Sequence, residues 1–152
     1  MKHIVLDTCI ILHILRANEL GKKSLDIIEN LGDDVIIIIS VVTKAELESL
    51  KIQQAWGANR VQKLNAFLAT AIYIDISSSD SILLECYAKI DAYSKRKGTD
   101  KNGNILHGSA RTMGKNDLWI VATAYSLNLT LLTADGDFDH LHNTFLNIIK
   151  IA

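Results

Sequence analysis

Four short motifs, spread over the whole chain, each carry one or two carboxylates. They are Leu6-Asp7-Thr8, Ala45-Glu46-Leu47, Asn116-Asp117-Leu118-Trp119 and Thr133-Ala134-Asp135-Gly136-Asp137-Phe138. Each acid lies where the sequence pattern predicts the end of a strand or the start of a helix, and an α/β sheet brings such ends together in one crevice. Carboxylates gathered there repel one another unless a cation neutralises them. The motifs therefore predict a divalent-metal site that is assembled from distant parts of the chain.

Two of the acids also have a structural interpretation as helix caps. Asp7 follows three apolar residues and precedes a helical pattern, so it suits an N-cap position. Glu46 ends the capping-box pattern Thr43-Lys44-Ala45-Glu46. If Ser40 is the N-cap instead, Glu46 lies beyond the box and is free to project into the crevice. The sequence leaves both arrangements of Glu46 open.

The remaining acids have structural interpretations as well. Asp117 follows Asn116, a good N-cap candidate, and the helix dipole favours an acid in the first turn. The residues after Asp117 are almost wholly apolar, which predicts a buried helix with an acid at its N-terminal end. Asp135 and Asp137 fit an ordinary Asp-Gly turn in which Asp137 caps residues 138–141, and the Thr133 hydroxyl is a potential hydrogen-bonding companion. Because all these explanations would have to hold at once, one shared site is the better interpretation.

The ligand types indicate which metal such a site would bind. The set contains only oxygen ligands, which suits Mg²⁺ or Mn²⁺ and argues against zinc. The five histidines are scattered and are expected to be structural or on the surface. Cys9 and Cys86 lack metal-type spacing and are expected to be buried thiols in a reducing, cytoplasmic environment.

Composition excludes several classes of protein. The 152 residues predict a single domain, 1–152, with a substantial core. No apolar run reaches the roughly 18 to 20 residues that span a bilayer, so no membrane association is expected. Asp7 interrupts the first apolar stretch, so no signal peptide is expected either. With a net charge of −1, the electrostatic field of the whole protein gives no indication that it binds nucleic acid.

Strands and helices are expected to alternate along the chain. The expected strands are 4–6, 35–39, 71–76, 130–133 and 146–151. The expected helices are 10–16, 24–31, 44–54, 59–68, 80–95 and 117–127. This alternation predicts a parallel, doubly wound sheet with helices on both faces. Residues 97–114 contain four glycines and no clear periodicity, which predicts a long loop of the kind that is often functional.

The four motifs, extended by their neighbours, resemble those of PIN-domain ribonucleases in order and spacing. The resemblance is specifically to the VapC-like toxins of bacterial and archaeal toxin–antitoxin pairs. It rests on residues 5–8, 40–47, 114–124 and 132–138 and covers nearly the whole chain. It implies a PIN-like three-layer α/β/α fold around a central, mostly parallel sheet of about five strands.

The resemblance also implies roles for individual residues. The acidic quartet would consist of Asp7, Glu46, Asp117 and Asp135. Asp137 would be an auxiliary acid, and Thr133 and Asn116 would support the ligands. Cys9 stands where the family often has asparagine, and the loop at 97–114 is longer than expected for the compact toxins.

The implied activity is endonucleolytic hydrolysis of RNA phosphodiester bonds with Mg²⁺ or Mn²⁺ at the carboxylates. A homodimer and a small antitoxin partner are implied as well. The cations predicted to contact RNA phosphates are Lys44, Lys95, Arg96, Lys97, Arg111 and Lys115. The alternative for the basic segment is a solvated loop without a ligand. The alternative function is a catalytically inactive PIN-like module that binds RNA or a partner, whereas a phospho-acceptor domain is disfavoured because Asp7-Thr8-Cys9 supplies only one acid.

Overall fold

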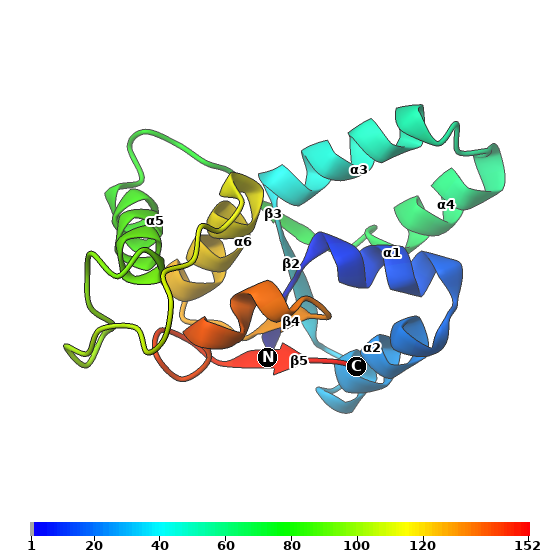
Figure 1. Ribbon diagram of the computed structural model, residues 1–152. Helices are drawn as coiled ribbons and strands as arrows, with labels where there is room; N and C mark the ends of the chain where they lie inside the picture. The colour runs from blue at the N-terminus through cyan, green and yellow to red at the C-terminus, as the bar shows by residue number, and fades with distance from the viewer. Residues whose placement is uncertain (1) are drawn as a thin grey trace.

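A five-stranded sheet forms the centre of the computed structural model, which describes residues 2–152 (Figure 1). The strands are β1 (His3–Leu6), β2 (Ile36–Ser40), β3 (Ile72–Ile74), β4 (Leu131–Thr133) and β5 (Ile148–Lys150). Their order in the sheet is β3-β2-β1-β4-β5, and every neighbouring pair is parallel. The predicted α/β fold with a parallel five-stranded sheet is therefore confirmed.

The strand order places one crevice at the centre of the sheet. Strands β2 and β3 follow on one side of β1, and β4 and β5 lie on the other side. The order therefore changes direction between β1 and β4, and ligands of such sheets bind at the carboxyl ends of the strands beside this point. Asp7 is the first residue after β1, and Asp135 comes two residues after the end of β4.

Helices cover both faces of the sheet. They are α1 (Thr8–Arg16), α2 (Glu19–Asn30), α3 (Val41–Gln53), α4 (Ala58–Phe67), α5 (Ser81–Ser94), α6 (Lys115–Ser126) and the 3₁₀-helix η1 (Gly136–Leu141). One hydrophobic cluster joins α5, α6 and η1 to the sheet, and the other joins α1, α2, α3 and α4 to it. Successive residues of β1 alternate between the clusters, since Ile4 and Leu6 belong to one and Val5 to the other.

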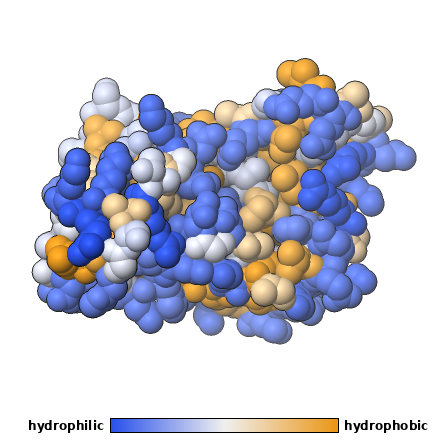
Figure 2. All heavy atoms as spheres, in the orientation of Figure 1, coloured by the Kyte–Doolittle hydropathy of each residue, from blue (hydrophilic) through white to orange (hydrophobic). Residues whose placement is uncertain are grey.

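The face of the molecule seen in Figure 2 is mostly polar. Figure 2 shows hydrophilic side chains over most of one face, with hydrophobic side chains scattered among them. No helix among residues 2–152 has the length and apolar composition needed to cross a membrane.

Several boundaries differ from the predicted ones. Helix α2 begins at Glu19 rather than at residue 24, because Asn18 caps it by accepting a hydrogen bond from Gly21 N at 2.9 Å. The strands β3 and β5 are shorter than predicted, at three residues each. Residues 97–114 contain no helix or strand, as their glycine spacing predicted.

The long loop is nevertheless held to the rest of the domain. The Asp100 carboxylate accepts hydrogen bonds from the backbone N–H groups of Asn102 and Asn104, at 2.8 and 3.0 Å. The Lys101 N–H donates to Thr144 O at 3.4 Å, and Leu106 is buried. The loop is therefore an ordered part of the α5–α6 face.

The contact between α1 and α2 depends on Gly21, which gives a first testable prediction. A Cβ atom at Gly21 would lie 2.2 Å from His13 O, whereas one at Gly57 would meet no atom within 4 Å. Gly21→Ala must therefore displace one helix and should lower the free energy of unfolding by about 2–3 kcal/mol. The matched change Gly57→Ala should cost less than about 1 kcal/mol. Urea unfolding followed by circular dichroism measures both, and equal effects would contradict the close approach.

Candidate metal centre

Asp7 caps α1 and faces the crevice at the same time. Its Oδ1 accepts a hydrogen bond from Thr8 N at 2.8 Å, as an N-cap does. Its Oδ2 accepts from Thr133 Oγ1 at 2.7 Å and from Cys9 Sγ at 3.1 Å. The side chain is buried, and burial raises the pKa of Asp7 although these donors act to lower it. The Asp7 carboxylate thus caps α1 and also contributes to the candidate metal site.

Cys9 supports Asp7 as a neutral thiol. Burial raises the pKa of Cys9 to about 12, and the neighbouring Asp7 charge acts in the same direction. A thiol with so high a pKa stays protonated at neutral pH, so it can donate its hydrogen to Asp7. The residue that departs from the family pattern therefore keeps a donor beside the first acid.

Glu46 is free of the capping box. Ser40 is the N-cap of α3 and accepts a hydrogen bond from Val42 N at 3.1 Å, so the capping-box interpretation of Glu46 is wrong. Instead, Thr8 Oγ1 donates to Glu46 Oε1 at 2.7 Å. The hydroxyls of Thr8 and Thr43 lie 3.0 Å apart, and Thr43 is fully buried. This pair of hydroxyls fixes Glu46 beside Asp7, a contact across 38 positions that sequence pattern alone does not reveal.

Three acids approach one another most closely. One carboxylate oxygen from each of Asp117, Asp135 and Asp137 lies within 4.8 Å of the other two. Asp117 belongs to the first turn of α6, whose N-cap is Gly114, so the prediction that Asn116 caps this helix is wrong. Asp7 and Glu46 lie outside this closest group but near enough for their charges to act on Asp117.

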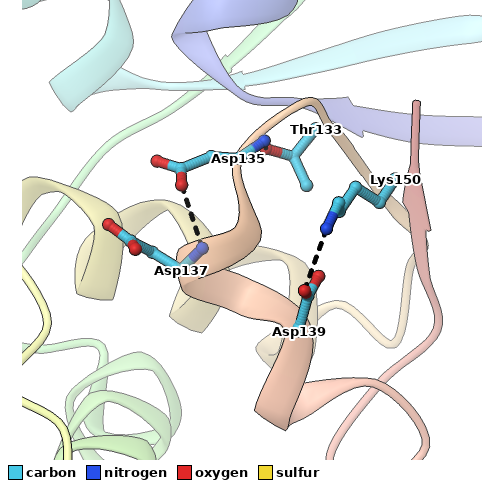
Figure 3. Close-up of polar contacts among 5 residues, drawn as sticks. All are labelled: Thr133, Asp135, Asp137, Asp139 and Lys150. Atoms are coloured by element: carbon cyan, nitrogen blue, oxygen red, sulfur yellow. Dashed lines mark hydrogen bonds and ion pairs between the residues drawn. The ribbon is translucent and has the colours of Figure 1, made fainter. Parts of the chain in front are cut away.

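The turn after β4 arranges two of these acids. Asp135 N donates to Thr133 Oγ1 at 3.0 Å, and Asp135 Oδ1 accepts from Asp137 N at 2.9 Å. Asp135, not Asp137, therefore caps the short helix η1. Figure 3 shows the carboxylates of Asp135 and Asp137 on one side of the turn, whereas Asp139 points away and pairs with Lys150 at 2.9 Å.

The electrostatics show that the five acids form one cluster. The pKa of Asp117 is raised to about 7, first by burial and then by the charges of Asp7, Asp135, Glu46 and Asp137. No positive side chain appears among these influences. A set of oxygen ligands with mutually repelling charges fits a hard divalent cation, and the closest group, formed by Asp117, Asp135 and Asp137, would hold it.

Thr133 gives a second testable prediction, because it contacts two of the acidic residues. Thr133→Val removes a hydrogen bond to a charged group and should cost about 1.5–3 kcal/mol of stability. The affinity for Mn²⁺ should fall about 10- to 100-fold, as for other residues that orient ligands. The matched control is Thr123→Val, which is equally buried but donates only to Trp119 O within α6. Calorimetric titration with Mn²⁺ compares them, and equal affinities in the two variants would refute the role of Thr133.

The predicted cations divide into two groups. Lys115 begins α6 two residues before Asp117, and Arg111 lies close enough to His140 of η1 for its charge to lower the pKa of that histidine. Lys44 is on α3, where its Nζ lies 5.0 Å from the Tyr73 ring centroid. Lys44 and Lys115 therefore belong to the helices that carry Glu46 and Asp117, and Arg111 lies in the loop that leads into α6.

The cations at the end of α5 are placed differently. Lys95 pairs with Asp91 at 3.0 Å, and Arg96 and Lys97 follow it. The next residues, Gly98–Lys101, line a hollow together with Tyr125, two turns beyond Asp117 on α6. The loop first turns back along α5, where Lys97 N donates to Ala92 O at 2.8 Å, and later returns beside Ser94, whose carbonyl oxygen accepts from Arg111 N at 2.7 Å. Contact of Lys95, Arg96 and Lys97 with RNA stays a prediction.

Two histidines near the acidic turn are structural, in agreement with the sequence. His140 Nε2 lies 2.8 Å from Ser94 Oγ, and its ring stacks with Tyr93 at a centroid distance of 6.3 Å. Burial, followed by the charge of Arg111, lowers the pKa of His140 to about 4. His142 Nδ1 accepts from Ile148 N at 2.9 Å. These contacts fasten η1 to α5 and β5 and leave the acids as the ligand set.

Comparison with known proteins places this site in a family. The chain matches the PIN domain over residues 4–143. Its fold is similar to solved structures of VapBC2 from Rickettsia felis (TM-score 0.74, 23% identity) and of VapBC-5 from Mycobacterium tuberculosis (TM-score 0.63, 24% identity). The alignments cover 97% of this chain and 98% of the first, and 99% of this chain and 100% of the second. A search of curated proteins finds no match. The domain match spans most of the chain and coincides with the acidic crevice, so the chain belongs to the PIN domain family.

Proposed function

We propose that the protein is a metal-dependent endoribonuclease and the toxin of a VapBC-like toxin–antitoxin pair. The observation that carries this proposal is the convergence of five carboxylates at the carboxyl ends of β1 and β4. Burial, followed by the charges of the other four acids, raises the pKa of Asp117 to about 7, which is a strong perturbation of the kind found at functional sites. The PIN domain match supports a nuclease, and the similar folds include a member of the VapBC family of toxin–antitoxin systems.

The residues around the acids have distinct tasks in the proposed reaction. Asp117, Asp135 and Asp137 would hold Mg²⁺ or Mn²⁺, with Asp7 and Glu46 beside them, and the cation would supply Lewis acidity and an activated water. Thr133 holds Asp7 and the turn that carries Asp135. Thr8 occupies Glu46 Oε1, which leaves Glu46 Oε2 for a ligand bond or for a proton taken from the attacking water.

The substrate proposed for this site is single-stranded or loop RNA. An acidic crevice repels phosphates, so the phosphate contacts must come from its rim. Lys44 and Lys115 are on the helices that carry Glu46 and Asp117, and Arg111 lies near His140 of η1, so these three cations would supply the contacts. An A-form duplex hides its base edges in a deep, narrow groove, which favours unpaired RNA as the substrate.

The same family relationship supports two proposed protein partners. One is a small antitoxin that covers the acidic crevice, since the similar structures include a toxin–antitoxin complex from Klebsiella pneumoniae. The other is a second copy of the chain in a homodimer. Both would meet the protein in the cytoplasm. Size-exclusion chromatography with light scattering, alone and after co-expression with the product of a neighbouring short reading frame, measures both assemblies.

The test of this function is a cleavage assay with purified protein. Single-stranded RNA, duplex RNA and single-stranded DNA are incubated with Mg²⁺, with Mn²⁺ and with a chelator. Cleavage of single-stranded RNA that requires the cation and leaves 5′-phosphate and 3′-hydroxyl ends is expected. Binding of RNA without cleavage under every condition would support the inactive binding module instead.

A further inference from the structure

A groove of about 420 Å³ lies along α3 and contains one of the acids. Its volume falls within the range of pockets that hold small organic groups. Glu46 lines the groove and also belongs to the acidic cluster. Asn116, the residue before Asp117, lines it from α6. A group seated in this groove is therefore directly connected to the candidate metal centre.

The apolar part of the groove comes from one face of α3. Val42, Ala45 and Leu50 line it, and together with the lining residues at 46, 49 and 53 they follow the three- and four-residue spacing of one helix face. Such a surface binds the flat, apolar face of an aromatic group by removing it from water. A charged phosphate would gain nothing from these side chains.

The polar part of the groove is neutral apart from Glu46. Gln53 Nε2 donates to Ser49 Oγ at 2.7 Å, which leaves Gln53 Oε1 and the second amide hydrogen available. The exposed side chain of Asn116 makes no hydrogen bond within residues 2–152, so its donors and acceptor are available too. Amides and hydroxyls of this kind read base edges, whereas phosphates are bound by cations, and no cation lines the groove.

From these features we infer that the α3 groove, lined by Val42, Ala45, Glu46, Ser49, Leu50, Gln53 and Asn116, binds an unpaired RNA base next to the cleaved phosphodiester and sets the base preference of the enzyme. The inference rests on the proposed ribonuclease function and adds a specificity site to it. The base stacks on the apolar side chains, and the side chains of Gln53 and Ser49 form hydrogen bonds with the edge of the base. Glu46 at the inner end repels the phosphate of the bound nucleotide from the groove.

The test compares base preference in two matched variants. Four sets of short single-stranded RNAs, which differ only in the bases on either side of the cleaved bond, are cleaved by the wild type, by Gln53→Leu and by Gln62→Leu. Gln62 is exposed on α4 and does not line the groove, so Gln62→Leu is the control. The wild type and the control should favour one base, and Gln53→Leu should reduce that preference about tenfold, the size expected for one lost base contact.

Each possible outcome decides one claim. If the wild type cleaves all four sets equally, or if Gln53→Leu keeps the wild-type preference, the inference is overturned while the ribonuclease function stands. The groove would then bind a different ligand, such as a segment of a protein partner. If the wild type cleaves no RNA, the proposed function fails and the base site fails with it. Gln53 is exposed, so the variant should fold as the wild type does, which circular dichroism verifies.

Discussion

Asp117→Asn should reduce RNA cleavage about 1,000-fold or more while the protein stays folded. Asp117 has one oxygen within 4.8 Å of oxygens from Asp135 and Asp137, so the variant removes a charge from the closest group of ligands. Charge stabilisation by a catalytic metal is worth several kcal/mol, and about 4 kcal/mol corresponds to three orders of magnitude in rate. Initial rates on an end-labelled RNA, with saturating Mn²⁺, measure the loss.

The control for this variant is Asp139→Asn, which makes the same chemical change a few residues from the cluster. Asp139 points away from the other acids and pairs with Lys150. An exposed pair of this kind contributes little to stability, so both the fold and the rate should be retained. Equal loss of activity in the two variants would mean that general negative charge, and not the Asp117 position, supports the reaction.

The second large effect concerns stability as a function of pH in the absence of divalent cations. The pKa of Asp117 is about 7 in the folded protein and close to 3.9 in an unfolded chain. Between these values the folded state binds more protons than the unfolded state, so stability falls as the pH rises from 4 to 7. The contribution of this half-buried group should be about 1–2 kcal/mol after solvent screening, or about 4 °C in melting temperature.

The assay is thermal unfolding with a chelator at pH 5 and at pH 8, for the wild type and for Asp117→Asn. The variant carries no charge at this position, so it should lose less stability over this range and be the more stable protein at pH 8. Added Mn²⁺ should raise the melting temperature of the wild type more at pH 8 than at pH 5, because the deprotonated site binds it better and ligand binding stabilises the folded state. If the variant and the wild type have the same melting temperature at both pH values, the pKa of Asp117 is not raised by burial and by the neighbouring charges.

The gathering of the acids could be predicted from the sequence because each one lies beside a strand end. Asp7 and Asp135 follow the strands that flank the change of direction in the sheet, and parallel topology alone brings such ends together. Asp117 lies in the first turn of a helix whose apolar sequence requires burial, and the burial of that helix also fixes the position of Asp117. These features depend on local pattern and on the rules of sheet topology.

The parts that could not be predicted depend on contacts between distant side chains. The start of α3 decides whether Glu46 caps a helix or faces the site, and residues 41–43 suit either a strand end or a helix start. The support that Thr8 gives Glu46 appears only once β1 and β2 are paired. The course of the basic loop is set by bonds such as that from Lys101 N to Thr144 O, which no periodicity predicts.

The activity proposed for the acidic cluster of this PIN domain is hydrolysis of RNA with a divalent cation. The most direct measurement is the cleavage rate of one end-labelled single-stranded RNA as Mn²⁺ is titrated into metal-free protein, for the wild type and Asp117→Asn in parallel. The wild type should show no cleavage in chelator, and its cleavage rate should increase to a plateau as Mn²⁺ is added. The rate of Asp117→Asn should remain near the background rate throughout. Full cleavage in chelator, or a normal plateau in Asp117→Asn, would contradict the claim.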